Sequence, residues 1–580
     1  MTESIRTENE RAFYRRFGIS LVEKDKSFAN CAKGQLERRF EEAERILREA
    51  APADRSKTLF AMVMGIGDGS FVRDLYKSLP KGAAILVWEP NWQVVTELSK
   101  RADISDLLED PDFSLAVGPL EEAKSILEKE LAKRVAMHNM YHAVLIPVPG
   151  FSDCYVKEAG DMIALFKKAI FELSTDVATR ECFQQLNARC ELFALSQLAD
   201  NSVVEQLFDA KPSLDVPIVI VAAGPSLSKN AERLRDLKER ALVIVVAHAA
   251  KKLVEMGIEP DLVAHADSEG GEKYTAFDKE GKLRFLVNAK SDIAIQEKYN
   301  GKLIYESVNL DLYTVPGIRK ETSDFENGGS VATNLCGLFL TAGFKTIILV
   351  GQDLAYSEEG FSHTGEEREE SSSDQMVTGI DGKPIRSRGD WIFFLRGFER
   401  LIPRYPDATV IDATEGGALI GGTKIMTLQD AIEKYCQKEY PITSWIEGLP
   451  KGTKEDRAAI ERIAQKHKKD SAAAFELLKE AVTKNRIIAD ALRERKLGES
   501  RYSADCTRYD ELYHVILTEN DAPLLMEYCD DLLQLYVKEA LSMESESDLS
   551  IKLDFEHSLF SKMQDRCEEL LDYLGELFPV

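Results

Sequence analysis

The sequence contains no stretch of 18 consecutive apolar residues, so a helix that crosses a membrane is not predicted. Cysteines are few and scattered: the nine residues run from Cys31 to Cys567 and include no Cys-x-x-Cys pair. This pattern predicts neither a disulfide framework nor a zinc site, and it is typical of reduced thiols in a cytoplasm. The first twenty residues are charged throughout and lack an apolar stretch, so we expect no secretory signal and a cytoplasmic location.

Positive charge is also scarce. The 580 residues include 74 Lys and Arg against 99 Asp and Glu, which gives a formal net charge of −25. Such a balance argues against nucleic acid or an anionic membrane as a partner. An anionic ligand remains possible, but only through local cations and backbone N–H groups.

A chain of this length exceeds what one hydrophobic core serves, so about three domains are expected. Strands alternate with helices in the first two regions, and helical periodicity takes over in the third. The predicted fold class is α/β. The domains are 1–200, a helical segment plus a small Rossmann-like domain and a helical connector (156–200); 203–430, a central doubly wound domain with a mostly parallel sheet; and 431–580, an all-helical domain. Strands in the central domain are expected at Ile218–Ala222, Leu242–Ala247, Leu262–His265, Arg284–Asn288, Leu303–Tyr305, Thr346–Val350 and Thr409–Ile411.

A glycine-rich turn follows the first predicted strand of the N-terminal domain. Its glycines are Gly65, Gly67 and Gly69, and Glu89 ends the next strand. The arrangement resembles the nucleoside corner of methyltransferase-like Rossmann folds, where an acidic residue binds ribose. The alternatives are a scaffold and a module that docks the acceptor.

The segment "IVIVAAGPSLSKN" opens the central domain with a buried strand that stops at Gly224, Pro225 and Ser226, followed by Leu227. A helix N-terminus offers unpaired N–H groups and partial positive charge, so this turn is a candidate phosphate seat. The segment matches neither the Walker A pattern nor Gly-x-Gly-x-x-Gly. An ordinary strand-to-helix turn with Ser226 as the helix cap is the alternative.

Polar residues follow each of the first six predicted strands of the central domain. Ligands of doubly wound sheets bind beyond the carboxyl ends of the strands, so this rim predicts a site. The sequence "ENGGSVATN" adds a second loop ahead of a helix, which can bring backbone close to a ligand. The rim residues are His248, His265, Asp267, Ser268, Asn288, Glu306, Ser307, Gln352 and Asp353, and the second loop holds Gly328, Gly329 and Ser330.

About 35 residues after Gly351 show little periodicity, and a loop of that length is typical of a lid or a disordered segment. Tyr356 and His363 lie in its first third. The acidic run Glu366–Glu370 is interpreted as a solvated loop rather than a metal site. The sequence shows no metal-ligand cluster, so no metal or other cofactor is expected to be required, although Mg²⁺ is left open.

Four segments resemble the central domain of the motility-associated (Maf) flagellin glycosyltransferases. They are "VIVAAGPSLSKN", "GIEPDLVAHADS", "NGGSVATNLCGLFLTAGFKTIILVGQDLAYSEEGFSHT" and "ATEGGALIGGTKIMTL". The flanking domains resemble the family's three-part layout in order and size. Gly-Pro-Ser-Leu also occurs in a bacterial sialyltransferase family and in an archaeal pterin pyrophosphokinase family.

The resemblance implies a cytoplasmic enzyme that moves a nonulosonic acid (pseudaminic, legionaminic or sialic-type) from its CMP-activated form to flagellin Ser or Thr, as flagellum assembly and motility require. It also implies roles for individual residues. Residues 224–227 would form the nucleotide loop and Asp267 an acidic contact. Gly329 and Ser330 would form the second ligand loop, and Gln352, Asp353, Tyr356, His363 and Thr364 the signature after the sixth strand.

Two departures from the family pattern affect these roles. At Ala247 and His248 the family has a small or acidic residue followed by a hydroxyl residue, so His248 replaces the hydroxyl of that contact. Arg386 and Arg388 occupy the segment that carries a base histidine in the related sialyltransferases, so that base cannot be transferred.

Transfer needs donors for the departing phosphate and a base for the acceptor hydroxyl. Phosphate donors are expected from Ser226, Ser330, Tyr356 and backbone N–H groups, with Arg386 or Arg388 adding a cation. The candidate bases are His363, Asp353 and Asp267, and Asp353 alternatively orients its loop. The helical C-terminal domain either contacts the acceptor protein or adds stability. The rival functions are a pterin pyrophosphokinase that uses ATP and Mg²⁺ and a non-catalytic flagellin chaperone.

Overall fold

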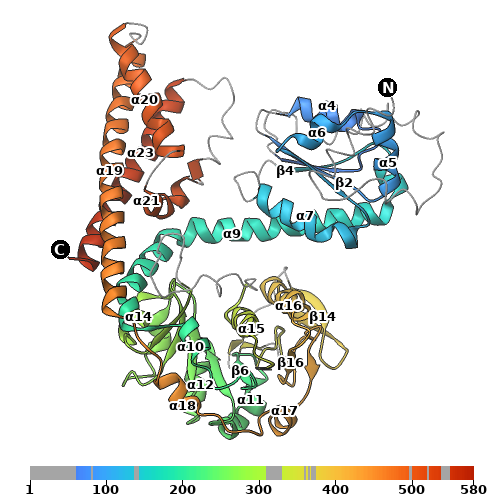
Figure 1. Cartoon of the computed structure of the whole chain (residues 1–580), viewed down its shortest axis with the longest axis vertical. Coiled ribbons are helices and arrows are strands. Elements are labelled where there is room, and N and C mark those ends of the chain that lie inside the picture. Colours follow the sequence, from blue (N-terminus) through green and yellow to red (C-terminus); the bar gives the residue numbers. More distant parts are fainter. Residues whose placement is uncertain are drawn as a thin grey trace. The chain divides into compact units, whose positions relative to one another are not determined.

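The structure is a computed structural model, which describes residues 60–79, 83–135, 143–307, 329–357, 361–363, 366–367, 374–494, 500–518, 522–533, 535–536 and 549–579. The chain divides into two compact units, residues 1–182 with 530–552 and residues 183–529 with 553–580 (Figure 1). The dividing point falls inside the long helix α9 (Val156–Gln197). The helical segment expected in residues 1–50 lies outside the described residues, and the three domain boundaries stay predictions.

The first unit holds a four-stranded parallel sheet with the order β3-β2-β1-β4. Strands β1, β2 and β3 are apolar and almost wholly buried, as in a sheet covered by helices on both faces. The predicted Rossmann-like arrangement is confirmed. Its elements are β1 (Phe60–Met64), α4 (Ser70–Ser78), β2 (Ala84–Glu89), α5 (Trp92–Arg101), α6 (Ser105–Glu109), β3 (Phe113–Val117), α7 (Leu120–Val135), β4 (Ala143–Pro147) and α8 (Phe151–Cys154).

The second unit is built on a nine-stranded parallel sheet with the order β17-β16-β11-β6-β7-β8-β9-β10-β5. From β6 the chain adds strands in one direction as far as β10, and then returns to place β11 on the other side of β6. The topological switch point therefore lies between β6 and β11. The strands are β5 (Ser202–Val203), β6 (Ile218–Val221), β7 (Leu242–Val246), β8 (Leu262–His265), β9 (Phe285–Asn288), β10 (Leu303–Ser307), β11 (Thr346–Val350), β16 (Thr409–Asp412) and β17 (Lys424–Ile425).

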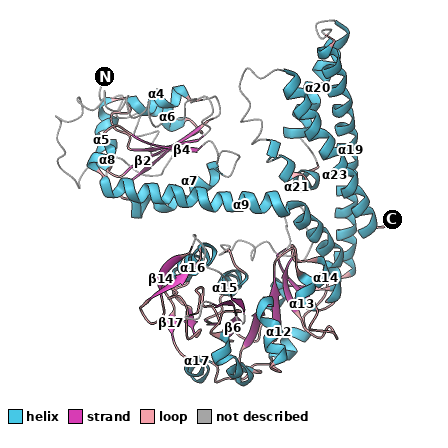
Figure 2. Cartoon of the chain, turned by 180° about the vertical axis from the view of Figure 1, so that it is seen from behind, coloured by secondary structure: helices cyan, strands magenta, loops and turns pink. Residues whose placement is uncertain are grey.

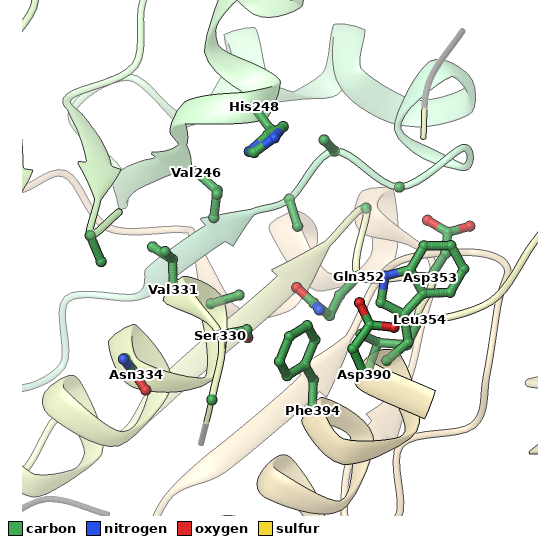
Figure 3. A pocket seen from close by; sticks show the side chains of 18 of the residues that line it. Val246, His248, Ser330, Val331, Asn334, Gln352, Asp353, Leu354, Asp390 and Phe394 are labelled. Carbon is green, nitrogen blue, oxygen red and sulfur yellow. The ribbon is translucent and has the colours of Figure 1, made fainter. Parts of the chain in front are cut away.

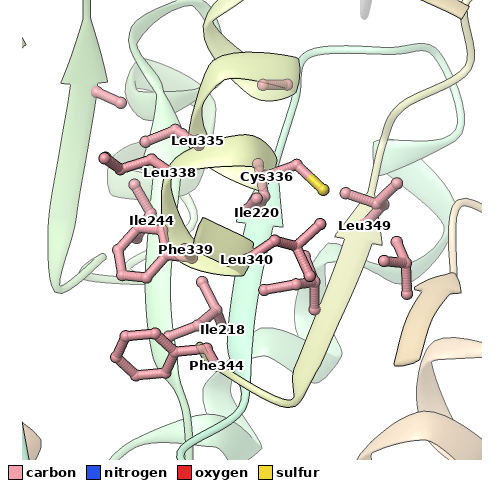
Figure 4. Close-up of a cluster of buried hydrophobic side chains, with 14 of the residues drawn as sticks. Ile218, Ile220, Ile244, Leu335, Cys336, Leu338, Phe339, Leu340, Phe344 and Leu349 are labelled. Atoms are coloured by element: carbon pink, nitrogen blue, oxygen red, sulfur yellow. The ribbon is translucent and has the colours of Figure 1, made fainter. Parts of the chain in front are cut away.

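Helices cover this sheet, and α15 lies against its middle (Figures 2 and 4). Leu335 and Phe339 of α15 belong to the same buried cluster as Ile218 and Ile220 of β6 and Leu349 of β11. This packing fixes the N-terminus of α15 relative to the ends of both strands. The helices around the sheet, with α15 among them, are α10 (Val204–Asp209), α11 (Leu227–Asn230), α12 (Ala247–Glu255), α13 (Gly271–Thr275), α14 (Ile293–Lys298), α15 (Val331–Thr341) and α16 (Gly389–Leu401).

Beyond residue 428 the described elements are helices, as predicted. A buried polar network links three of them: the Asn485 amide donates to Tyr509 Oη and to the Leu553 carbonyl, and Tyr509 donates to Glu556. The predicted α/β class with Rossmann-like domains and a helical C-terminal region is confirmed. The helices are α17 (Leu428–Tyr435), α18 (Ile442–Glu447), α19 (Lys454–Arg493), α20 (Ser500–Thr518), α21 (Pro523–Tyr528) and α23 (Leu549–Leu577).

The expectation of a featureless 35-residue loop after Gly351 was wrong in part. Two short antiparallel hairpins form there, β12 (Phe361–His363) with β13 (Glu366–Glu367), and β14 (Gln375–Thr378) with β15 (Pro384–Ser387). Strand β14 is largely exposed and β15 is half-buried, and their short sequences, Gln-Met-Val-Thr and Pro-Ile-Arg-Ser, show no apolar alternation that would reveal them.

Candidate functional site

A cavity of about 600 Å³ opens at the switch point of the second unit, beyond the carboxyl ends of β6, β7, β8 and β11 (Figure 3). Its walls come from the turns after these strands and from the N-terminal parts of α15 and α16. Both the place and the size are those of ligand sites in doubly wound folds. The lining residues are Ala222, Ala223, Gly224, Val246, His248, Ala266, Asp267, Gly329, Ser330, Val331, Ala332, Asn334, Gly351, Gln352, Asp353, Leu354, Arg388, Asp390, Trp391 and Phe394.

At the floor of this cavity, Asp353 links the turn after β11 to the turn after β6. Its carboxylate accepts the Ser226 hydroxyl at 2.6 Å and the Ser226 backbone N–H at 3.2 Å. The side chain is 6% exposed, and burial raises its pKa to about 6 even though the Ser226 bonds lower it. Of the two roles predicted for Asp353, the structure shows the orientation of the loop.

Glycine is needed at two positions because the turns after β6 and β11 touch. A Cβ on Gly224 would overlap the Asp353 carboxylate and the Gly351 carbonyl. Gly351 has φ of +65°, and a Cβ there would overlap the Ala222 carbonyl. The Gly224 N–H donates to the Gly351 carbonyl at 2.8 Å. Gly224 of the Gly-Pro-Ser segment is therefore required because it allows the two turns to pack in direct contact.

The Gly-Pro-Ser turn is a poor phosphate seat in this conformation. The N–H of Leu227 donates to the Gly224 carbonyl and that of Ser228 to the Pro225 carbonyl, while Asp353 holds Ser226. The following helix α11 has only four residues and leads into the 3-10 turn Ala231–Leu237, so its dipole is small. Pro225, Ser226 and Leu227 do not belong to the cavity lining.

The N-terminus of α15 is a better anion site. Ser330 caps it: its hydroxyl accepts the Thr333 N–H at 3.1 Å, and its carbonyl accepts the Asn334 N–H at 2.9 Å. The caps leave the N–H groups of Val331 and Ala332 in the first turn of an 11-residue helix, and both residues line the cavity. A helix start of this kind attracts phosphate through its N–H groups and its dipole.

Helix α16 contributes two aromatic rings that sequence reasoning missed, and its N-cap residue Arg388 contributes a cation. The Arg388 guanidinium bonds Asp390, with Nε 2.6 Å from Oδ1, and lies 4.5 Å from the centre of the Trp391 ring. Phe394 lies one turn further along the same wall (Figure 3). Arg388 was proposed from the sequence; the aromatic pair is visible there as an amphipathic "RGDWIFFLRGF" segment, but nothing in it indicates a cavity.

Arg386 and Tyr356 lie behind this wall and do not line the cavity. The Arg386 guanidinium is 4.3 Å from the centre of the Tyr356 ring, and that ring packs 5.0 Å from Trp391. Tyr356 is buried, and its N–H donates to the Arg386 carbonyl. These two predicted ligand contacts therefore support Trp391 from behind.

His248 and Asp267 line the cavity from the ends of β7 and β8, as the predicted rim requires. Gln352 also lines it, and its amide points between Ser330 and Phe394 (Figure 3). The Gln352 N–H donates to the Thr414 hydroxyl at 3.2 Å, which fixes the turn.

The far part of the predicted rim forms a separate cluster. The Asn288 amide donates to Glu306 at 3.3 Å, and burial raises the pKa of Glu306 to about 7. Ser268, Asn288 and Glu306 do not belong to the cavity lining. His363 ends β12 opposite Glu366, but its side chain and that of Ser307 lie outside the description, as do Gly328 and Thr364. Their roles stay predictions.

The glycine turn of the first unit packs against protein atoms. The Glu89 side chain is 2% exposed and accepts the N–H groups of Ile66 and Asn91 at 3.1 and 3.0 Å. A Cβ on Gly65 would lie 2.7 Å from the Phe151 ring, and one on Gly67 3.2 Å from Val148. Glu89 thus holds the turn instead of presenting both oxygens to a ribose, which favours the scaffold interpretation.

Within the described ranges, no group of three or more His, Cys, Asp or Glu side chains is arranged to hold a metal ion. The helices in the same ranges include none that combines the length and apolar character needed to cross a bilayer.

Residues 192–359 match a family model described as 6-hydroxymethylpterin diphosphokinase MptE-like. No curated protein sequence matches the chain. Among solved structures, the Maf glycosyltransferase from Magnetospirillum magneticum AMB-1 matches with a TM-score of 0.66 and 15% sequence identity, over 100% of this chain and 98% of that one.

The match covers both α/β sheets and the helical region in one alignment. At 15% identity the likeness establishes the fold. The resemblance stated from the sequence is confirmed at that level: the chain has, over its full length, the fold of a Maf glycosyltransferase.

Proposed function

We propose that the chain is a Maf-type glycosyltransferase that moves a nonulosonic acid from a CMP-activated donor to serine or threonine hydroxyls of flagellin, in the cytoplasm. The observation that carries the proposal is the cavity at the switch point, which combines an open helix N-terminus, a cation and aromatic rings in a fold shared with a glycosyltransferase. The proposal rests on the sequence motifs for the identity of donor and acceptor.

The parts of the cavity suit the parts of such a donor. The phosphate would lie at the N–H groups of Val331 and Ala332, where developing negative charge is stabilised as CMP departs. Arg388 would add a positive charge to a wall that otherwise carries Asp267, Asp353 and Asp390. Phe394 and Trp391 offer flat apolar surfaces for the sugar or the base.

An anion in the cavity would compete with Asp390 for Arg388. Arg388 is now paired with Asp390, and a phosphate or sugar carboxylate would compete for the same guanidinium. Such an exchange replaces the ion pair with Asp390 by one with the ligand, and the Asp390 carboxylate, whose side chain is 45% exposed, can then be solvated.

A nucleotide screen tests the proposal. Thermal unfolding is measured with CMP, with ATP and Mg²⁺, and with neither. We expect CMP to raise the midpoint, because a ligand that binds only the folded state stabilises it. Hydrogen exchange should then slow at the amides of 329–334. A midpoint raised by ATP with Mg²⁺ and not by CMP contradicts the proposal.

That contrary result would support a pterin pyrophosphokinase-like activity, which the MptE-like match of residues 192–359 favours as a second candidate. The matched segment contains both turns of the cavity and α15, but it ends before α16. Dependence of CMP binding on Arg388 would separate the two candidates further. A chain that binds neither nucleotide would point to the third candidate, a non-catalytic flagellin chaperone.

A further inference from the structure

His248 is the second residue of α12 and lines the cavity after β7. The Tyr274 hydroxyl oxygen lies 2.7 Å from its Nε2 and 3.0 Å from its Nδ1. The two rings meet edge to face, with centres 4.9 Å apart. Tyr274 belongs to α13 and is only 6% exposed, so the hydroxyl is held in place by the packing of α12 against α13 and β8.

His265, the last residue of β8, lies on the other side of the tyrosine. Its ring centre is 5.2 Å from that of Tyr274, it is 3% exposed, and neither of its ring nitrogens has a hydrogen-bond partner. Burial lowers its pKa to about 4, although Asp267 and Asp292 raise it. His265 is therefore neutral near pH 7, and it adds no positive charge that would oppose protonation of His248.

The charged groups around this pair have both signs. Asp267 lines the same cavity as His248, and Lys273 Nζ lies 4.7 Å from the centre of the Tyr274 ring. A carboxylate near an imidazole favours its protonated form, and an ammonium group opposes it. Asp267 is exposed to the cavity, and its carboxylate would stabilise the protonated form of His248.

On the basis of the proposed function, we propose that His248 is the general base of the transfer and that Tyr274 is its positioning residue. Histidine is the side chain whose ordinary pKa lies closest to neutral pH, which suits it to take a proton and release it again. Figure 3 shows the ring across the opening from Asp390 and Phe394 of α16. An acceptor hydroxyl that enters the opening can thus reach His248 while the donor lies along α15 and α16.

Asp353, another candidate base, is engaged elsewhere, because its carboxylate accepts the backbone N–H and the hydroxyl of Ser226. A base needs an orienting partner as well as access, and His248 has both.

The step balances as follows. The Tyr274 oxygen accepts the N–H of one ring nitrogen of His248, and the other ring nitrogen takes the proton of the acceptor hydroxyl as the hydroxyl oxygen forms a bond to the anomeric carbon. The bond from that carbon to the phosphate oxygen breaks, and CMP leaves with the electron pair. The imidazolium then gives its proton to solvent, and His248 returns to the neutral form.

The test compares His248→Ala, His248→Gln and Tyr274→Phe in the full chain, with the exposed His514 of α20 as the matched control, His514→Ala. CMP affinity is measured by calorimetry, and transfer to flagellin is measured with and without added imidazole.

We expect both His248 variants to keep CMP affinity within about threefold and to lose about 10² or more in transfer, the scale of a lost general base. Imidazole should restore transfer at least tenfold in His248→Ala. Tyr274→Phe should lower kcat and leave the donor KM unchanged, and the control should change nothing.

A structural role of His248 cannot produce rescue by imidazole, so rescue supports the proposal. CMP affinity that falls in step with transfer, without rescue, would make His248 a donor contact and overturn it. Rescue of His363→Ala in place of His248→Ala would overturn it as well, in favour of the lid histidine. If His248→Ala does not fold, His248→Gln decides through the split between affinity and transfer. A parent chain that binds no CMP refutes the proposed function itself, which distinguishes the two failures.

Discussion

Removal of the Asp353 carboxylate tests whether this residue fastens the two turns or serves the chemistry. In Asp353→Ala, the Ser226 hydroxyl and N–H both lose their acceptor. Ser226 is buried, so neither donor can turn to water without local opening. The change therefore removes a contact that joins β6 to β11, the two strands that flank the switch point.

Its size follows from two opposing effects. A buried donor left without an acceptor costs about 1–3 kcal/mol, and this substitution leaves two such donors, the hydroxyl and the backbone N–H of Ser226. The parent, however, spends free energy to bury the ionised carboxylate, as the pKa of about 6 records. The burial cost offsets roughly 3 kcal/mol of the two lost hydrogen bonds, so we expect the second unit of Asp353→Ala to lose about 1–3 kcal/mol of unfolding free energy near pH 7.

The effect should also depend on pH, with a definite sign. The folded pKa of about 6 lies above the ordinary aspartate value of about 3.9, so the folded state binds this proton more tightly. The parent therefore loses stability relative to Asp353→Ala as pH rises between these two values. The unfolding free energy of the parent therefore exceeds that of Asp353→Ala by more at pH 5 than at pH 8. The excess changes by about 1.4 kcal/mol for each unit of pH between the two pKa values.

The assay is a double-mutant cycle with Ser226→Ala, followed by hydrogen exchange in a peptide that covers residues 218–230. Because Ser226 and Asp353 share a bond, their effects should fail to add by about 1 kcal/mol or more. Asp267→Ala is the control, since this aspartate is exposed and its loss should change stability by less than about 0.5 kcal/mol. Additive effects, or an Asp353→Ala protein as stable as the control but inactive, would refute the fastening role and make Asp353 a catalytic candidate again.

Three further predictions follow from other contacts. Gly224→Ala should fail to fold or lose the cavity, because its Cβ would overlap Asp353 and the Gly351 carbonyl; a soluble variant with parental CMP affinity would contradict the packing described. Arg388→Ala should weaken CMP binding about tenfold by calorimetry, in line with the loss of one charge-assisted hydrogen bond, whereas the exposed Arg404→Ala should not. Glu89→Ala should leave CMP affinity unchanged but speed hydrogen exchange at Ile66 and Asn91, whose N–H groups it would release; a loss of CMP binding would show that the first unit takes part in donor binding.

The sequence determined the strands and their ends well. The apolar, β-branched runs predicted Leu262–His265 and Thr346–Val350 to the residue, because strands buried on both faces are continuous in apolar character and stop at polar turns. It also determined that polar residues gather at one edge, since parallel strands end together. His248, Asp267, Gln352 and Ser330 of that set do line the cavity.

Only the tertiary structure decided what each of these residues does. The Gly-Pro-Ser turn has the sequence of an anion-binding loop, yet Asp353, 127 positions further along the chain, takes its amide and hydroxyl. The contacts of Trp391 with Tyr356, and of His248 with Tyr274, likewise join separate elements whose spacing leaves no periodic signal. Local patterns specify elements because neighbouring residues share one backbone geometry, whereas a hydrogen-bond partner is chosen by packing between elements, which the sequence encodes only through the whole fold.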